Sequence, residues 1–198
     1  MATGRQDADA HRESTLATQA RRAQLLDVTI GMVAKHGYAQ TSLARIAEGA
    51  GVTKAAVLYH YPSKDALIGI AYEHVLTALI DEVAAAVEGA DPRDGPAAYV
   101  RAMVGHLAAH PRHSRMIIEA MTNTDADYDS KSRWEPLAQI IDAAARARGV
   151  EPVDVRATAL IAGGGIDALV AEHLHDPGYD VTVAAETLVR MLDTALSR

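Results

Sequence analysis

Residues 41–64 read TSLARIAEGAGVTKAAVLYHYPSK, and this stretch predicts two short helices joined by a tight turn. In the first of them, apolar residues recur at helical spacing, which places them on one face that packs inward. These residues are Leu43, Ile46, Ala47 and Ala50. Gly51 follows and ends the helix, because glycine is the residue that most readily leaves helical geometry there.

The second short helix begins at a capping residue and has a buried stripe of its own. Thr53 can accept a hydrogen bond from the helix N-terminus, while Val57 and Tyr61 lie four residues apart on one face. Pro62 ends this helix, and Ser63 caps a long third one. Two short helices with an intervening turn predict a helix-turn-helix, in which the free face of the second helix enters the major groove of DNA.

The motifs around this stretch resemble those of the TetR family of bacterial transcriptional regulators, from about residue 21 to about residue 67. The matching positions are Gly37, Tyr38, Thr41 and Ser42, then Ile46-Ala47-Glu48, Ala50-Gly51-Val52, Lys54 and Tyr59-His60-Tyr61-Pro62-Ser63-Lys64. The resemblance implies an all-α fold: an N-terminal three-helix helix-turn-helix DNA-binding domain followed by a C-terminal helical ligand-binding and dimerisation domain. It also implies a homodimer on a palindromic double-stranded DNA operator.

The resemblance and the helix-turn-helix geometry together predict the DNA contacts. The family usually has Tyr where this chain has Leu58, so we assign the backbone contact to Tyr59 and expect Leu58 to meet a thymine methyl group. The full set of expected DNA-binding residues is Arg22, Thr41, Ser42, Thr53, Lys54, Ala55, Ala56, Leu58, Tyr59, His60 and Lys64.

The charge distribution fits such a contact although the net charge of the chain is −7. Residues 1–64 carry eight Lys/Arg against five Asp/Glu, a net charge of +3, so the remainder carries −10. A basic N-terminal part on an acidic body presents one end of the protein to phosphate.

Beyond the helix-turn-helix, the sequence predicts helices separated by Gly, Pro and Asp clusters and no strand. We expect a disordered arm over residues 1–16, a DNA-binding domain over 17–65 and a helical regulatory and dimerisation domain over 66–198. The helices predicted after the DNA-binding domain cover about 64–88, 97–109, 112–122, 132–148, 153–175 and 181–197.

The family pattern suggests two further sites in the C-terminal region. A pocket for an effector is expected among Met, aromatic and polar residues of its helices: His74, Met103, Met116, Met121, Tyr128, Trp134, Ile166 and Asp167. A dimer interface is expected on the last two helices at Leu160, Ile161, Gly164, Leu169, Leu188, Met191 and Leu192. Residues Gly163-Gly164-Gly165 lie in an apolar helical pattern, which indicates close helix packing or room for a ligand.

No metal site is predicted. His173 and His175 are two residues apart on a helix, so their side chains diverge. His106, His110 and His113 have better spacing, but Pro111 interrupts their helix.

Catalysis, disulfides and membrane insertion are not expected either. The chain has no cysteine and no pairing of a nucleophile with a base, so we predict neither an enzyme nor a bound cofactor. The polar N-terminus is unlike a signal peptide, and no apolar stretch reaches about 20 residues. We therefore expect a cytoplasmic, nucleoid-associated protein.

The predicted function is a DNA-binding transcriptional regulator, a repressor released from a palindromic operator by an unidentified small-molecule effector. Two alternatives remain. The chain could be a DNA-binding helical dimer that binds constitutively and is controlled by a protein partner, or a helical enzyme that has kept a helix-turn-helix.

Overall fold

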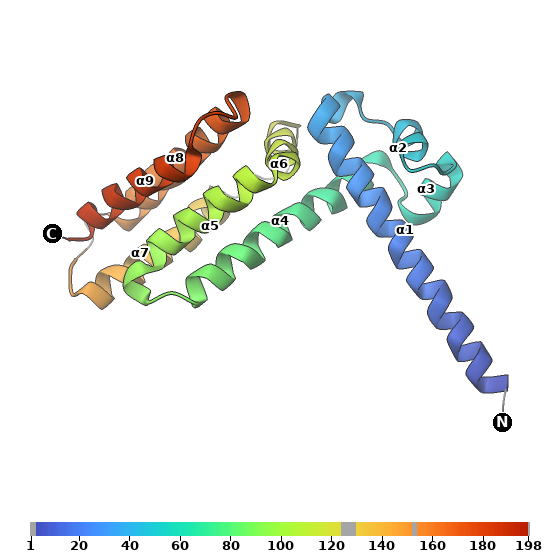
Figure 1. The fold of residues 1–198 in the computed structure, drawn as a ribbon, viewed down its shortest axis with the longest axis horizontal. Helices are drawn as coiled ribbons and strands as arrows, with labels where there is room; N and C mark the ends of the chain where they lie inside the picture. Colours follow the sequence, from blue (N-terminus) through green and yellow to red (C-terminus); the bar gives the residue numbers. More distant parts are fainter. Residues whose placement is uncertain (1–2, 124–129, 152–153, 198) are drawn as a thin grey trace. The chain divides into compact units, whose positions relative to one another are not determined.

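The computed structural model describes residues 3–123, 130–151 and 154–197 (Figure 1). Over these ranges the chain forms nine α-helices and one short 3-10 helix, with no strand, as predicted. It divides into two compact units: Met1–Val75 with Arg115–Asn123, and Leu76–Ser114 with Thr124–Arg198. Two helices, α4 (Lys64–Glu88) and α6 (Pro111–Asn123), therefore run from one unit into the other. The boundary expected between residues 65 and 66 lies near the start of α4, whereas the two units divide this helix between Val75 and Leu76.

The first unit contains the predicted helix-turn-helix. Helix α1 (Thr3–Gln40) is kinked at Gly37, whose φ of 78° lies in the left-handed region. Helices α2 (Leu43–Gly49) and α3 (Lys54–His60) follow, and Gly51 between them has a φ of 64°. The helices bury one apolar core made of Leu25, Ile46, Ala47, Ala50, Val57, Tyr61 and Leu67.

Residues 3–16 belong to α1, so the expected disordered arm is not what the structure shows there. No proline occurs in α1, and no glycine lies between Gly4 and Gly31. Ala, Arg, Gln and Glu in this stretch favour helix, so nothing in the local sequence ends the helix before it reaches the polar N-terminus.

A second apolar cluster of the first unit joins the C-terminal half of α1 to α4 and α6. Its buried members are Ile30, Val33, Ile68, Ala71, Val75 and Met116. Met116, expected to line an effector pocket, is fully buried in this cluster. Met116 lies on the apolar face of the amphipathic helix α6. The sequence pattern alone does not show whether that face lines a pocket or packs in a core.

The second unit is a helical bundle. Besides the C-terminal part of α4 it contains a 3-10 turn (Pro92–Asp94), α5 (Gly95–Ala109), α7 (Ser130–Arg148), α8 (Val155–His175) and α9 (Val181–Ala195). Helix α5 packs against α7, α8 and α9, and α8 also packs against α7 and α9 (Figure 1). The approach of α8 to α9 is close at Gly165, where a Cβ atom would lie 3.3 Å from Leu188 Cδ2.

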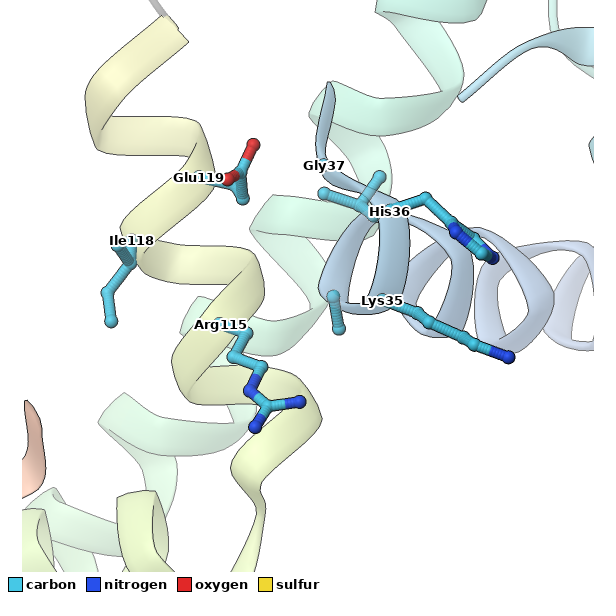
Figure 2. Close-up of a pocket in the computed structure, with 8 residues that line it drawn as sticks. Lys35, His36, Gly37, Arg115, Ile118 and Glu119 are labelled. Atoms are coloured by element: carbon cyan, nitrogen blue, oxygen red, sulfur yellow. The ribbon is translucent and has the colours of Figure 1, made fainter. Parts of the chain in front are cut away.

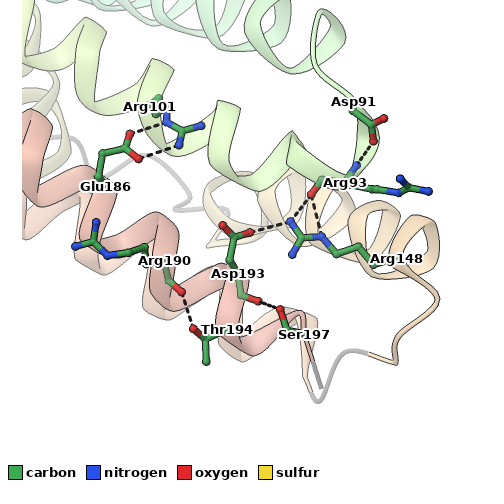
Figure 3. A network of polar contacts seen from close by, with 9 residues as sticks. All are labelled: Asp91, Arg93, Arg101, Arg148, Glu186, Arg190, Asp193, Thr194 and Ser197. Atoms are coloured by element: carbon green, nitrogen blue, oxygen red, sulfur yellow. Dashed lines mark hydrogen bonds and ion pairs between the residues drawn. The ribbon is translucent and has the colours of Figure 1, made fainter.

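Ion pairs join the helices of this bundle at its surface (Figure 3). The Arg101 guanidinium on α5 donates two hydrogen bonds to the Glu186 carboxylate on α9, at 2.6 and 2.8 Å. This pairing lowers the pKa of Glu186 and raises that of Arg101. Arg148 on α7 donates to Asp193 Oδ1 at 2.8 Å and to the Arg93 carbonyl. Among the described residues, no helix combines the length and apolar character that crossing a membrane requires.

Candidate nucleic-acid interface

Helix α3 has one buried face and one exposed face. Val57 is fully buried and Tyr61, at its C-cap, is 1% exposed. On the opposite side, Tyr59 is 83% exposed and Leu58 42% exposed. Lys54 and Ala55 at the start of the helix are exposed as well. A large aromatic side chain held almost entirely in solvent beside an apolar one and a lysine is a surface suited to stacking, methyl contact and phosphate binding.

Two hydroxyl groups expected to contact DNA also cap the helices of the motif. Thr53 Oγ1 accepts a hydrogen bond from the Ala56 N–H at 3.1 Å, and Ser42 Oγ accepts from the Arg45 N–H at 3.3 Å. Ser42 is half-buried, whereas Thr53 is exposed. Both side chains thus fix the start of a short helix, and Thr53 has the more accessible hydroxyl.

Thr41 is a correction to the expected contact set. Its side chain is only 3% exposed, and its hydroxyl donates to the Gly37 carbonyl at 2.8 Å. The hydroxyl satisfies a backbone acceptor left free where α1 kinks. Thr41 and Ser42 therefore have different structural roles. The Thr41 side chain stabilises the end of α1, and Ser42 caps the start of α2.

Lys64 also has an internal partner. Its ammonium group donates to the Tyr38 carbonyl at 3.3 Å and lies 4.0 Å from the centroid of the Tyr38 ring. The Tyr38 hydroxyl donates to the Asp65 carboxylate, and this hydrogen bond raises the pKa of Tyr38. Lys64 thereby ties the start of α4 to the end of α1, and a DNA contact by its ammonium would have to compete with these interactions.

The remaining expected contacts surround α3. The Arg22 side chain is exposed, with its guanidinium carbon 5.7 Å from the centroid of the Tyr61 ring. His60 is half-buried, with its ring centroid 5.1 Å from that of Tyr59 and 6.5 Å from that of Tyr61. Ala56 is half-buried. Of these three residues only Arg22 is exposed, and only His60 has its ring against that of Tyr59.

Arg45 is a basic residue of the motif that the expected contact set omits. It is exposed on α2, and its guanidinium donates to the Gln40 carbonyl at 2.7 Å. The signal was present in the sequence, since Arg45 is the one basic residue between Thr41 and Gly51 and lies on the polar side of α2.

A cleft of about 350 Å³ in the first unit lies between the end of α1 and α6 (Figure 2). The Glu119 carboxylate on α6 accepts a hydrogen bond from the Tyr38 N–H at 2.9 Å, just after the kink at Gly37. The lining residues are Val33, Ala34, Lys35, His36, Gly37, Arg115, Ile118 and Glu119. Glu119 thus fastens α6 to the end of α1, a contact across 81 residues that the sequence pattern did not predict.

The expected effector-pocket residues do not form one set. His74 is exposed. It belongs to the first unit, as does Met116. The side chains of Met121 and Tyr128 lie outside those the structure describes. The second unit holds the other four: Met103 and Trp134 are half-buried, Ile166 is buried, and exposed Asp167 pairs with Arg133 at 2.7 Å.

Trp134 has a polar atom of particular interest. Its indole Nε1 is buried and has no hydrogen-bond partner among the described residues. The Arg156 guanidinium carbon lies 4.8 Å from the centroid of the ring. A buried N–H without an acceptor costs about 1–3 kcal/mol, so a ligand that supplies an acceptor at this point would recover that energy.

The expected dimer interface separates into two groups. Leu160, Ile161 and Met191 are 50%, 70% and 62% exposed, and Gly164 is exposed too. In contrast, Leu188 and Leu192 are buried inside the unit, and Leu169 is half-buried. The family pattern led us to expect the apolar residues of α9 at a partner chain, but Leu188 packs on α8 instead. Val183, which is 62% exposed on α9, was not among the expected interface residues.

The geometry of the first unit defines a helix-turn-helix protein whose second helix offers an exposed face to DNA. Residues 25–69 match the family described as bacterial regulatory proteins, tetR family. Residues 25–69 thus carry the N-terminal region of the TetR family, as the motifs had indicated.

Curated relatives match mainly through the N-terminal part. The chain is 36% identical over 84 residues to the HTH-type transcriptional regulator BetI of Burkholderia thailandensis, and the match covers 42% of each chain. It is 26% identical over 129 residues to the HTH-type transcriptional repressor AcnR of Corynebacterium diphtheriae, covering 65% of this chain and 63% of AcnR. The chain thus spans less than half the length of BetI. These relatives are regulators, not enzymes.

The whole fold is similar to solved structures. FadR of Bacillus subtilis in complex with stearoyl-CoA superposes with a TM-score of 0.70 at 18% identity, over 87% of this chain and 98% of FadR. At this identity the likeness shows the fold alone.

Proposed function

We propose that this protein is a homodimeric transcriptional repressor that binds a palindromic operator through α3 and is released by an effector bound in its second unit. The observation that supports DNA binding best is the exposed face of α3, where Tyr59 is 83% exposed above a core that fully buries Val57. The packing of α3 keeps the Tyr59 side chain in solvent. Neither the fold nor the core requires an aromatic residue at this position, so its presence supports a role in binding.

The proposed contacts are those that the structure leaves accessible: Arg22, Thr53, Lys54, Ala55, Leu58 and Tyr59, with Ser42 and Arg45 at the start of α2. Lys54 and Arg45 supply charge for phosphates, and Leu58 supplies an apolar contact for a thymine methyl group. Lys64 and His60 act mainly by holding the motif together.

Exposed apolar residues on α8 and α9 support the dimer. Leu160, Ile161, Val183 and Met191 are apolar side chains left uncovered in the single chain, and exposed Gly164 lets a facing helix approach. A two-fold axis at this surface would present two copies of α3 to the two half-sites of a palindrome.

Release by an effector is supported by the second unit. The buried, unpartnered Trp134 Nε1 offers a hydrogen-bond donor to a ligand. Tyr99 on α5 of the same unit is half-buried. Burial, and then the charge of Asp167, raise the pKa of Tyr99, so its phenol stays protonated and can donate as well. The structure of FadR with stearoyl-CoA shows that this fold can hold a ligand.

The experiment uses linkage between the two sites. DNA retained by the purified protein is sequenced to obtain the operator, and small molecules are then screened through the fluorescence of Trp134, the only tryptophan. Each hit is titrated onto free protein and onto the protein–operator complex. An inducer binds the DNA-free form about 5- to 150-fold more tightly. Equal affinities for both forms contradict release by that effector and favour control by a protein partner.

A further inference from the structure

Three histidines and a glutamate of the second unit gather at the junction of α4, α5 and α6. His106 on α5 is only 3% exposed, and its Nδ1 lies 2.5 Å from Glu82 Oε2 on α4. Its other ring nitrogen, Nε2, lies 3.3 Å from His113 Nδ1 on α6. The His110 ring is close to both, with centroids 4.6 Å from His106 and 5.0 Å from His113.

Pro111 was expected to separate these histidines, but the turn at this proline keeps them together. His110 leaves helical geometry before Pro111, with φ −121° and ψ 67°, and its N–H still donates to the His106 carbonyl at 2.9 Å. The His113 N–H then donates to the His110 carbonyl at 2.9 Å, so α6 begins at once. In a straight helix the spacing i, i+4, i+7 would also place the three histidines on one face. The turn at Pro111 keeps them together, with His113 Nδ1 3.3 Å from His106 Nε2.

We propose that this cluster binds a divalent transition-metal ion such as Zn²⁺, with His106, His110 and His113 as ligands. In a tetrahedral zinc site with Zn–N bonds of 2.0–2.1 Å, two ligand nitrogens are about 3.3–3.4 Å apart. The separation of His106 Nε2 and His113 Nδ1, 3.3 Å, has this value. His106 and His110 also have donor atoms within 4.8 Å of one another, in a group that Glu82 completes.

Glu82 has a distinct part in this arrangement. The Glu82 carboxylate oxygen lies 2.5 Å from His106 Nδ1, where it can accept a hydrogen bond from a protonated Nδ1. In that tautomer the lone pair of Nε2 is free for a metal. Zinc-bound histidines commonly have such a carboxylate on the second ring nitrogen, where it orients the ring and strengthens it as a ligand.

The chemistry of the donors selects the class of ion. Imidazole nitrogens suit Zn²⁺, Ni²⁺, Cu²⁺ and Fe²⁺, whereas Ca²⁺ and Mg²⁺ require oxygen ligands. Three protein ligands leave a fourth position for water or for a donor atom of another molecule. His110 and Glu82 are exposed, so the ion has a path from solvent.

The site would also bear on regulation, a step that rests on the proposed function. Its side chains come from α4 and α6, the two helices that continue into the first unit, and from α5. A bound ion would tie α5 to α6 through its histidine ligands, and the Glu82–His106 contact ties α5 to α4, so the ion would favour one arrangement of α4 and α6 over others. A metal ion is therefore a candidate effector or co-effector of operator binding.

The test of the site uses tag-free full-length protein stripped with a chelator, and Zn²⁺ or Co²⁺ alone as the probe. Calorimetry should show one Zn²⁺ per chain, and Co²⁺ should give the visible absorption of a tetrahedral site. His110→Gln and His113→Gln should each weaken binding by at least about tenfold, and Glu82→Gln by about 10- to 100-fold. His175→Gln, an exposed histidine at the end of α8, is the matched control and should bind as wild type does.

Absence of stoichiometric uptake by the folded protein overturns the site, as does uptake that His110→Gln and His113→Gln leave unchanged. Circular dichroism melting of each variant shows whether it is folded, and both substituted residues are at least partly exposed.

The regulatory step is tested separately by adding Zn²⁺ to the stripped protein on its operator. A change in affinity that His110→Gln abolishes supports it; metal uptake without such a change overturns it. Failure to bind any operator contradicts the proposed function and leaves the metal measurement intact.

Discussion

Individual side chains of the helix-turn-helix do two different kinds of work. Thr41 and Lys64 match the family motif but hold α1, α2 and α4 together through the Gly37 and Tyr38 carbonyls. Lys54 and Tyr59 match it as well and remain in solvent. Motif membership alone therefore does not identify a DNA contact; burial and hydrogen bonding separate the two groups.

Lys54→Ala should reduce both operator affinity and its dependence on salt. Each neutralised phosphate contributes about 0.9 to the slope of log K against log salt, so loss of one contact should flatten that slope by about 1. The measurement is fluorescence anisotropy of a labelled operator duplex at several salt concentrations. Lys131→Ala, an exposed lysine of the second unit, removes the same charge and should leave the slope unchanged. A Lys54→Ala protein with the wild-type slope would mean that Lys54 touches no phosphate.

At the scale of elements, the turn between α2 and α3 depends on backbone geometry. Gly51 has a φ of +64°, a conformation that side chains other than glycine rarely adopt. The Thr53 cap follows it, so the turn and the cap together set the direction of α3. The space around Gly51 is open, which leaves conformation as its main constraint.

Gly51→Ala should lower the free energy of unfolding by about 1–2 kcal/mol because of the left-handed backbone at this position. Gly69→Ala provides the matched control. Gly69 lies in α4 with ordinary helical geometry and open space for a Cβ atom, so alanine there should stabilise the protein by up to about 1 kcal/mol. Urea unfolding of the two variants should move the midpoint in opposite directions. Equal shifts would show that the Gly51 conformation is not the constraint.

The sequence predicted most elements because periodicity and caps act locally. The starts at Lys54 and Lys64 follow from the expected Thr53 and Ser63 caps, whose hydrogen bonds are both present. The Ser42 cap of α2 was found only in the structure. Packing partners were harder to predict. Met116 and Leu188 lie on apolar stripes, and a stripe does not say whether a core, a ligand or another chain covers it. The histidine cluster was missed because Pro111 was expected to separate residues that its turn brings together.

At the scale of the whole molecule, the single chain leaves apolar surface uncovered on α8 and α9. Ile161 and Met191 are 70% and 62% exposed, far more than packing within the unit would leave. Inside the second unit, apolar side chains such as Val100, Ile141 and Ile166 are buried, and Arg101 pairs with Glu186 at the surface. Pairing of two chains at this face would cover the apolar side chains and place two helix-turn-helix motifs in one molecule.

Gly164→Leu should separate the dimer without unfolding the chain. A Cβ atom at Gly164 meets nothing within 4 Å in the single chain, so the larger side chain would collide only with a partner. Sedimentation at low micromolar concentration should show monomer, and operator affinity should fall with it. Gly105→Leu, also on an exposed helical glycine with open space, is the control and should stay dimeric. A fully dimeric Gly164→Leu protein would place the interface elsewhere.

The central claim is that the exposed face of α3 reads DNA, and selection of sequences from a random duplex library tests it most directly. Wild-type protein should enrich an inverted repeat whose half-sites lie about 34 Å apart, one turn of DNA. Tyr59→Ala should enrich it weakly or not at all, because Tyr59 contributes most of the exposed face while Val57 and Tyr61 still hold α3 in place. No enrichment by the wild type, or equal enrichment by a folded Tyr59→Ala protein, would contradict the account.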